Sequence, residues 1–507
     1  MSDDKKPHEE KNNNNNNTTP DDVDDVPFCV LPERRKVALI LTASFMGMVS
    51  PMSAGIYYPA LPALSADMHV SYSLINLSVT TYLILQAVAP SFTGSFSDVH
   101  GRRPAYIFCF VTYLGANIGL ALQSNYAALM VLRCVQAAGS SGTIAIGSAV
   151  VADISTRAER GKYIAYASIG TTMGTAIGPV LGGILNHFLG WRWIFWFLAI
   201  LSGVFLLIVL VLMPETCRAV VGNGSIPPPA WNRPLWTIAR NHLWPSSSAV
   251  AAPRIYHESL QQSRRRPNPL TSVQILLEKE AGVVLVYGAL VFAGYMIVTS
   301  TLSAQLESQF HFNSIQVGLC YLPFGLGSLT SRWTVGPLLD WNFRREARLQ
   351  NMPIVKNRQE DIRNFNIERA RLTVTMPLLY TGSLCMIAYG WVMYFRTSLA
   401  GPVIMLFLNG HLIAGAFTSL SSLIIDTHRA SAATAMAANN LMRCLFAAGA
   451  AAFATPLIDR INIGWTGTFC AAVWIVFSPC LWLVYLRGHR WREELRRKQE
   501  EKHGVEG

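Results

Sequence analysis

Charge is scarce in this sequence, and that scarcity excludes an ordinary soluble domain. Only 14% of the 507 residues are charged and 51% are hydrophobic, whereas soluble domains have roughly 25% charged residues. A helix of about 20 apolar residues can cross a bilayer, and isolated strands or loops cannot face lipid. The sequence therefore predicts an all-α membrane protein with twelve transmembrane helices. The expected spans are residues 36–60, 74–94, 104–124, 126–152, 162–188, 193–213, 281–303, 316–338, 372–395, 401–425, 431–457 and 466–486.

The sequence also lacks the patterns of an enzyme or a metalloprotein. Its nine cysteines are scattered, with neither paired nor metal-ligand spacing. Neither H-E-x-x-H nor G-x-S-x-G occurs, and the Asp-rich sequence is confined to the N-terminal tail. We therefore expect no catalytic residues, no metal and no cofactor, and we expect the cysteines to act as small apolar residues.

Two blocks of six spans flank a polar centre, which predicts five segments. The N-terminal stretch has too few apolar residues to fold and no signal-peptide pattern. The expected segments are a disordered cytoplasmic tail (1–35), an N-terminal six-helix bundle (36–213), a central cytoplasmic loop (214–280), a C-terminal six-helix bundle (281–486) and a basic cytoplasmic tail (487–507).

The lysines and arginines predict the orientation. With both termini in the cytoplasm, 35 of the 41 lie in cytoplasmic segments, as the positive-inside rule requires. The net charge of +11 is thus explained by topology, because the basic residues are spread over seven segments and no nucleic-acid recognition module is present. We expect a multi-pass protein of the plasma membrane that does not bind nucleic acid.

A charged element occurs once in each half. The sequence G-S-F-S-D-V-H-G-R-R at Gly94–Arg103 returns 242 residues later as G-P-L-L-D-W-N-F-R-R at Gly336–Arg345. A duplicated block of spans is typical of secondary transporters built from two six-helix repeats. We therefore expect two pseudo-symmetric bundles, with a charged hairpin at the same point in each.

The first of these elements resembles the loop between spans 2 and 3 of the major facilitator superfamily. The resemblance implies a transporter that works by alternating access, in which the element holds the cytoplasmic side closed. In that family the aspartate caps a helix end in the opposite half, and the arginine pairs with an acid at the end of span 4, where Asp153 stands here. The expected gating residues are Gly94, Asp98, Gly101, Arg102, Arg103, Asp153, Asp340 and Arg344.

Span 5 suggests the branch of that family. Between Gly170 and Gly183 it reads G-T-T-M-G-T-A-I-G-P-V-L-G-G, with a glycine at every fourth position from Gly170 to Gly182. Such a face permits close helix packing, and Pro179 loosens the helix because it lacks an N–H. The string resembles the antiporter motif of drug-efflux members. The residues implied are Gly174, Gly178, Pro179, Gly182 and Gly183.

Three shorter stretches agree with that branch. Y-Y-P-A-L-P at Tyr57–Pro62 resembles twelve-span drug:proton antiporters, and L-R-C-V-Q-A-A-G at Leu132–Gly139 resembles the family's R-x-x-Q-G pattern with its glycine displaced. P-E-T-C-R at Pro214–Arg218 differs from the P-E-S-P-R of sugar porters and is similar to fungal quinidine-resistance-type transporters and citrate exporters. The resemblance implies export.

Cationic groups inside the spans suggest the cargo. A central arginine costs roughly 3 kcal/mol to insert, so such a residue indicates function. Arg332 could also extend to the membrane surface, and His411 could be a packing histidine. No Asp or Glu lies in the middle of any span, which favours an anionic or neutral polar cargo over a cationic one. The expected substrate-binding residues are Arg133, Gln136, Arg332, His411, Asn440 and Arg443.

These observations predict a secondary active efflux transporter for small organic molecules, with organic acids or other anionic metabolites as the favoured cargo. Its expected partners are the substrate, protons as a candidate coupling ion, and the lipid bilayer, and we expect a monomer. A broad-specificity drug or toxin:proton antiporter remains the alternative. A sensor that does not transport is less favoured, because the segment after Arg487 is short.

Overall fold

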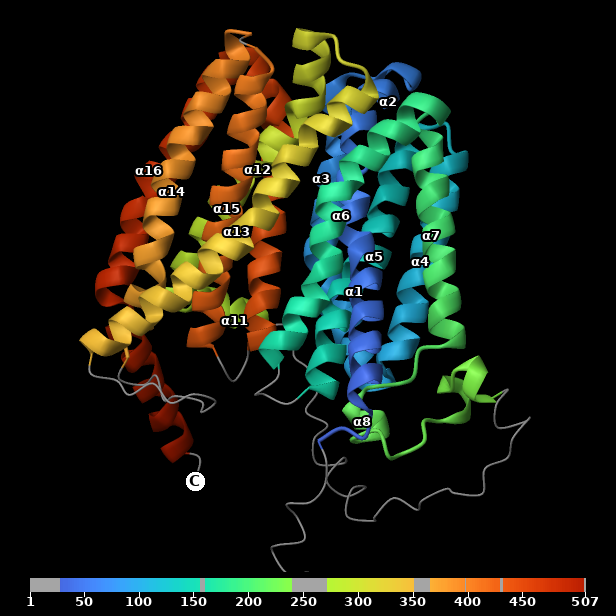
Figure 1. Cartoon of the computed structure of the whole chain (residues 1–507), viewed down its shortest axis with the longest axis vertical. Helices are drawn as coiled ribbons and strands as arrows, with labels where there is room; N and C mark the ends of the chain where they lie inside the picture. Colours follow the sequence, from blue (N-terminus) through green and yellow to red (C-terminus); the bar gives the residue numbers. More distant parts are fainter. Residues whose placement is uncertain are drawn as a thin grey trace, which may run out of the picture.

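The computed structural model describes residues 28–155, 160–238, 271–350, 365–396, 398–428 and 432–505, which form long helices and no strand. The helices stand side by side in two groups (Figure 1). The long helices of the first half are α1 (Glu33–Gly55), α3 (Tyr72–His100), α4 (Arg102–Leu122), α5 (Tyr126–Ile154), α6 (Arg160–Leu189) and α7 (Arg192–Val211). Those of the second half are α12 (Lys279–Phe310), α13 (Ser314–Leu349), α14 (Ile367–Tyr394), α15 (Ala400–Thr427) and α16 (Ala432–Val505). The short elements are η2 (Tyr58–Ala60), α2 (Leu61–Asp67), α8 (Arg218–Val221), η3 (Ala230–Asn232) and α11 (Thr271–Leu277).

The helices match the twelve expected spans once two features are considered. In the described part of the chain, ten helices are long and apolar enough to cross a membrane. The last two expected spans lie within the 74-residue α16, whose backbone leaves helical geometry at Asn462 (φ 60°, ψ 170°). The span expected at 316–338 lies in α13, which is not among the ten. With α16 divided at Asn462 and α13 counted, each half has six helices.

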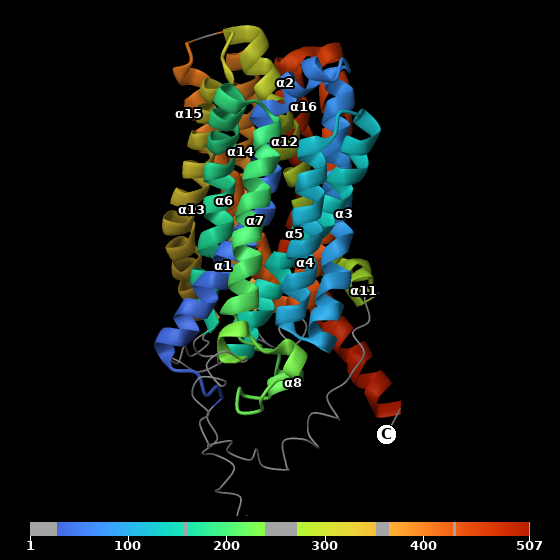
Figure 2. The same ribbon diagram turned by 90° about the vertical axis from the view of Figure 1, so that its right-hand side faces the viewer.

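The two halves meet along two pairs of helices, α3 with α16 and α6 with α13. Figure 2 shows α4 and α7 on the outer side of the first half, away from this seam. We call the end of the helices at which the α3–α4 turn and the described C-terminus lie the terminal end (Figure 1). The opposite end contains α2 and the α12–α13 turn.

Hydrogen bonds join the halves toward the opposite end. Asn186 of α6 donates to the hydroxyl of Ser314 in α13 at 2.8 Å, and Asn76 of α3 donates to the Ala451 carbonyl of α16 at 2.7 Å. Nearer the terminal end, α13 leans away from α6 (Figure 1). The described conformation therefore has the halves joined most closely at the opposite end.

The glycines of α6 pack directly against the backbone of α1. A Cβ atom on Gly174 would lie 2.6 Å from the Met48 carbonyl oxygen, and one on Gly178 would lie 3.2 Å from that of Met52. Gly170 and Gly182 approach the carbonyls of Ser44 and Ile56 more closely still. Four successive turns of α6 thus contact four successive turns of α1, as the small-residue spacing predicts.

Next to this stripe, α6 also contacts the second half. A Cβ atom on Gly183 would lie 3.1 Å from the Cα atom of Gly318 in α13, and one on Gly318 would lie 2.8 Å from the Pro179 carbonyl oxygen. Gly183 and Pro179 therefore lie at the seam between the halves, whereas the four-residue stripe lies within the first half.

The segments outside the bundles contain more structure than the sequence predicts. Residues 214–238 of the expected central loop form α8 and η3, and Glu215 and Asn232 are buried there. Residues 239–270 of that loop, and 1–27 of the expected N-terminal tail, lie outside the described residues. The expected C-terminal tail continues α16 as a helix to Val505.

Candidate functional site

The first charged element forms a tight turn around an arginine. Gly101 joins α3 to α4 with a φ of 109°, a conformation that favours glycine. Arg102 then donates from Nε to Asp153 at the end of α5 (2.8 Å), and it also contacts Asp98 and the hydroxyl of Ser97. The turn and both carboxylates therefore hold one buried guanidinium at the terminal end.

Glu215, which the sequence did not single out, anchors this turn. Its carboxylate accepts hydrogen bonds from the backbone N–H groups of Arg102 (2.8 Å) and Arg103 (3.2 Å), at the start of α4. It also accepts one from the side chain of Asn232 at 2.7 Å. A carboxylate at a helix N-terminus satisfies free N–H groups and interacts favourably with the helix dipole. The P-E-T-C-R string at Pro214–Arg218, which contains Glu215, was the sequence signal that could have identified this residue.

Arg103 and Gly94 take different positions from their neighbours in the element. Arg103 donates to the carbonyls of Val209 (3.2 Å) and Leu210 (3.0 Å), and so closes the end of α7. Gly94 has open space where a Cβ atom would lie, so close packing does not require a glycine there. Asp98 is 52% exposed, and its ionic partner in the described part of the chain is Arg102 of its own half.

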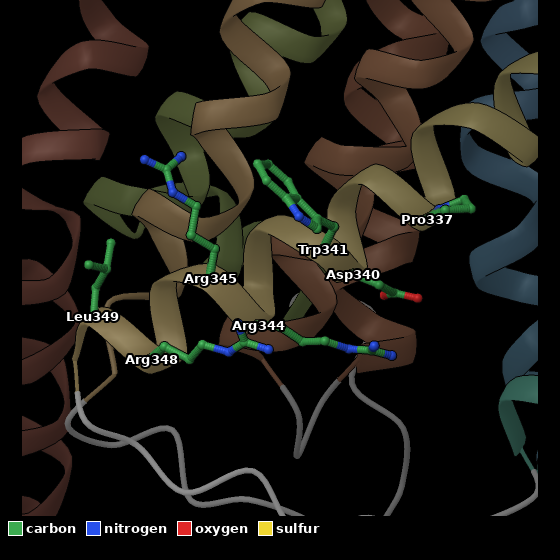
Figure 3. Close-up of a pocket in the computed structure, with 7 residues that line it drawn as sticks. All are labelled: Pro337, Asp340, Trp341, Arg344, Arg345, Arg348 and Leu349. Carbon is green, nitrogen blue, oxygen red and sulfur yellow. The ribbon is translucent and has the colours of Figure 1, made fainter.

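The prediction of a second charged hairpin is wrong. α13 continues without a break from Ser314 to Leu349, so Asp340 and Arg344 lie one turn apart on a single helix. Within the described residues neither forms an ion pair, and both line an open hollow on α13 (Figure 3). Phe343 stands where the first half has Gly101, and a bulky residue disfavours the positive φ that the turn requires.

The ion pair of the second half uses another arginine. Arg371 near the start of α14 donates to Asp426 near the end of α15 at 2.9 and 3.0 Å. Arg102 and Asp153 take the same positions on α4 and α5. The ion pair of the first half is therefore repeated in the second half. Its arginine, Arg371, lies 27 positions after Arg344, which the sequence offset of 242 residues indicates.

Arg133 lies fully inside the first half, between two aromatic rings. Its guanidinium carbon is 4.1 Å from the centroid of the Tyr57 ring and 4.4 Å from that of Tyr82. It donates to the Gln136 side-chain oxygen at 2.5 Å, and Gln136 in turn donates to Asn117 at 2.7 Å. The Arg133 Nε atom is buried without a hydrogen-bond partner, and the residue is 1% exposed.

Arg443 lies on α16 in the second half, and hydrogen bonds connect it to the first half. It donates to the Asn440 side-chain oxygen at 3.2 Å, and Asn440 donates to the backbone carbonyl of Gln86 in α3 at 3.3 Å. Gln86 is one helical turn from Tyr82, which contacts Arg133. The Nε atom of Arg443 is also buried without a partner. The structure thus links the two arginines through α3.

The remaining two expected residues lie on other helices of the second half, Arg332 on α13 and His411 on α15. The two ring nitrogens of His411 lie 2.9 and 3.2 Å from the hydroxyls of Thr330 and Thr334. Arg332 is exposed and donates to the Ser168 hydroxyl of α6 at 3.0 Å, so it joins the two halves. The structure does not place either residue in contact with Arg133.

None of the described carboxylates forms an ion pair with these cations. Across the residues that the structure describes, no Asp or Glu lies within ion-pair distance of Arg133, Arg332 or Arg443, and no group of His, Cys, Asp and Glu could hold a metal ion. An arginine without an acidic neighbour can receive the carboxylate of a bound molecule.

Sequence comparisons agree with this arrangement. A family model described as Major Facilitator Superfamily matches residues 43–452. The chain is 46% identical over 484 residues to MFS-type transporter R5 of Phoma sp., covering 95% of this chain and 91% of that protein. It is 48% identical to MFS-type transporter clz19 of Cochliobolus lunatus, covering 91% and 86%. It is 34% identical to Citrate exporter 1 of Aspergillus niger, covering 94% and 90%.

Two solved structures share the fold at low sequence identity. The human organic anion transporter MFSD10 (TETRAN) superposes with a TM-score of 0.54 at 18% identity, covering 89% of this chain and all of that one. A D-xylose-proton symporter superposes with a TM-score of 0.56 at 14% identity, covering 86% and 96%. Both support the expected two-bundle fold.

Proposed function

Because this chain belongs to the Major Facilitator Superfamily and is therefore a multi-pass membrane transporter and not an enzyme, we propose that it exports small organic anions by alternating access. The terminal end faces the cytoplasm in this proposal, since most basic residues lie in segments at that end. The protein works as a monomer in the plasma membrane.

The environment of Arg133 is the observation that supports anionic cargo. A desolvated guanidinium normally has a carboxylate partner, because an unpaired buried charge is costly. Arg133 has instead two aromatic faces, one amide oxygen and an unused N–H. A carboxylate of the cargo would satisfy that N–H and neutralise the charge, and it would accept a two-pronged hydrogen bond from the planar group.

Export is supported by sequence similarity. The glycine-rich span resembles exporters, and one relative at 34% identity is named a citrate exporter. Proton coupling is part of the proposal as antiport. The described spans offer His411 as a candidate proton acceptor, because a free imidazole nitrogen can take up a proton and two threonine hydroxyls hold its ring.

The charged turn is the proposed gate. Asp98 is half-exposed in the described conformation, and its expected partner is a helix end of the other half in the conformation that is closed at the terminal end. Contacts made in only one conformation shift the equilibrium between the two. Arg102 and Asp153 hold the turn that presents Asp98.

Uptake of labelled citrate into inside-out vesicles tests the proposal. We expect Arg133→Ala to remove about 2–3 kcal/mol of cargo binding, the scale of a hydrogen bond to a charged group. Arg133→Lys should restore little, because lysine lacks the planar fork. Arg192→Ala is the matched control, since Arg192 is a surface residue paired with Asp67. Normal anion export by Arg133→Ala would contradict the proposal.

A broad drug exporter is the second candidate, and one observation favours it. Aromatic residues gather beside Arg443: Phe292 lies under its guanidinium at 4.8 Å and packs against Tyr295 and Phe417. Aromatic surfaces bind neutral drug-like molecules. Cells that lack the protein would then become sensitive to neutral or cationic drugs and keep normal efflux of organic acids.

A further inference from the structure

The last part of α13, residues 333–349, presents a basic and aromatic face. Trp333 and Trp341 are 76% and 60% exposed. Trp341, Arg344, Arg345 and Arg348 follow the spacing of one helical face, and they line an open hollow together with Pro337, Asp340 and Leu349 (Figure 3). We call this set the α13 basic face.

The α13 basic face is held in a fixed position. On the other side of the helix, Asn342 donates to the Ala370 carbonyl of α14 at 2.7 Å. The ring of Phe343 packs edge-on against that of Phe365, with centroids 5.1 Å apart, and Ala347 is fully buried. The arginines therefore project from a helix that is packed on its neighbour, which reduces the entropy lost when they bind a ligand.

The positive charge of this face is not neutralised within the described residues. Arg344, Arg345 and Arg348 are exposed and form no ion pair there, and Asp340, one turn before Arg344, forms none either. Like charges one helical turn apart repel each other. Favourable interaction with the negative C-terminal end of the helix dipole explains some basic residues here, but it does not explain a hollow with a tryptophan beside them.

The position of the face indicates the chemistry of its ligand. It lies at the terminal end of a helix that corresponds to an expected span. Exposed tryptophans at the end of a span lie at the level of the lipid headgroups. Arginine recognises phosphate through its planar fork, and basic clusters beside membrane helices bind anionic headgroups.

We propose that the α13 basic face binds the headgroup of an anionic phospholipid, with Arg344, Arg345 and Arg348 placed around the headgroup and the Trp341 ring, next to Arg345, against the adjacent part of the lipid. This proposal requires that the helices span a membrane, but it does not depend on which cargo is exported.

Native mass spectrometry of the purified full chain in detergent, titrated with phosphatidylserine, tests the proposal. We expect the triple variant R344Q/R345Q/R348Q to bind this lipid at least about tenfold more weakly, because it removes three positive charges that attract the anionic headgroup. The matched control, R487Q/R490Q/R497Q, removes three exposed arginines from α16. It should change the affinity by no more than about twofold.

A gain-of-binding variant keeps the test decisive if the triple variant does not fold. Asp340→Asn removes the negative charge from the hollow and should strengthen phosphatidylserine binding, which misfolding cannot imitate. Phosphatidylcholine has the same phosphate but no net charge, so the triple variant should lose less affinity for it than for phosphatidylserine, and inorganic phosphate should not compete. Equal losses in the triple variant and its control would overturn the proposal, as would unchanged binding by Asp340→Asn or competition by free phosphate.

Discussion

Arg371 donates two hydrogen bonds to a single carboxylate oxygen of Asp426, and the pair joins α14 to α15 as Arg102 and Asp153 join α4 to α5. The second-half pair is less buried. Its side chains are 15% and 21% exposed, against 9% for each member of the first-half pair. Each half thus has an equivalent arginine–aspartate pair, and the pair of the second half is more exposed to solvent.

A double-mutant cycle on Arg371→Ala and Asp426→Ala should show this coupling. We expect an interaction energy of about 1–2 kcal/mol, within the range for residues in direct contact. The same cycle on Arg102 and Asp153 should give a larger value, because burial strengthens the attraction and makes a lone charge more costly. Thermal unfolding in detergent is the measurement. Additive effects at Arg371 and Asp426 would show that the pair contributes nothing.

Asp98→Asn should slow transport about tenfold and leave cargo affinity unchanged, because it removes the negative charge of a side chain that is expected to cap a helix end of the other half in only one conformation. Transport into vesicles and equilibrium binding of labelled cargo measure the two effects separately. Asp67→Asn is the control, since Asp67 is an exposed carboxylate whose ionic partner, Arg192, belongs to the same half. Lost binding with normal conformational exchange would contradict the gating role of Asp98.

Glu215→Ala should destabilise the protein by about 2–3 kcal/mol, because it leaves buried N–H donors at the start of α4 without an acceptor. Glu215→Gln should cost less, since its amide retains one oxygen. Thermal unfolding in detergent gives both values. If the alanine variant unfolds at the wild-type temperature, the carboxylate does not anchor the turn.

Gly182→Ala should destabilise the protein by at least about 1–3 kcal/mol, the usual cost of overpacking. Its new methyl group would collide with the Ile56 backbone carbonyl, which cannot move without displacing α1. Gly203→Ala in α7 is the matched control. A Cβ atom there meets open space, and alanine favours the helix by up to about 1 kcal/mol. Equal stability of the two variants would exclude the α1–α6 packing as a constraint.

Cysteine labelling should place the terminal end in the cytoplasm. Cysteines introduced at the exposed positions Val99 and Leu349 should react with a membrane-impermeant maleimide only in inside-out vesicles, and those at Phe188 and Phe395 only in intact cells. The native Cys217 should stay unlabelled at pH 7, because burial raises the pKa of its thiol to about 11 and the thiolate is the reactive form. Labelling of Val99 from outside the cell would reverse the proposed orientation.

The sequence was sufficient to predict the helices and the charged turn of the first half. Apolar length predicts the spans, because backbone hydrogen bonding in lipid permits few alternatives. Arg102 could be matched to Asp153 because Gly101 marks the turn and resemblance to the family supplied the partner. In the second half the repeated glycine, aspartate and arginines suggested a second turn. Phe343, which stands at the position of Gly101, already indicated that no tight turn would form.

Other features required the three-dimensional structure. Arg133 was identified from its charge within a span and from the string that resembles the R-x-x-Q-G pattern. Its aromatic neighbours Tyr57 and Tyr82 come from other elements, and their distance along the chain gives no indication of contact. Arg371 and Asp426 are 55 positions apart, and only the packing of α14 on α15 brings them together. Glu215 follows the first bundle in sequence, yet it binds the start of α4, because the chain folds back beneath that bundle.

The packing of α6 on α1 constrains how the two halves can move. Four consecutive turns of backbone contact leave no room for α6 to slide or twist against α1, so the two helices move as one stiff pair. Gly183 and Pro179 are the residues of this pair that contact α13. Any rearrangement that opens the opposite end must therefore separate this stiff pair from α13 at Pro179 and Gly183, and the loss of that backbone contact, more than flexibility within any single helix, would set the rate of the cycle.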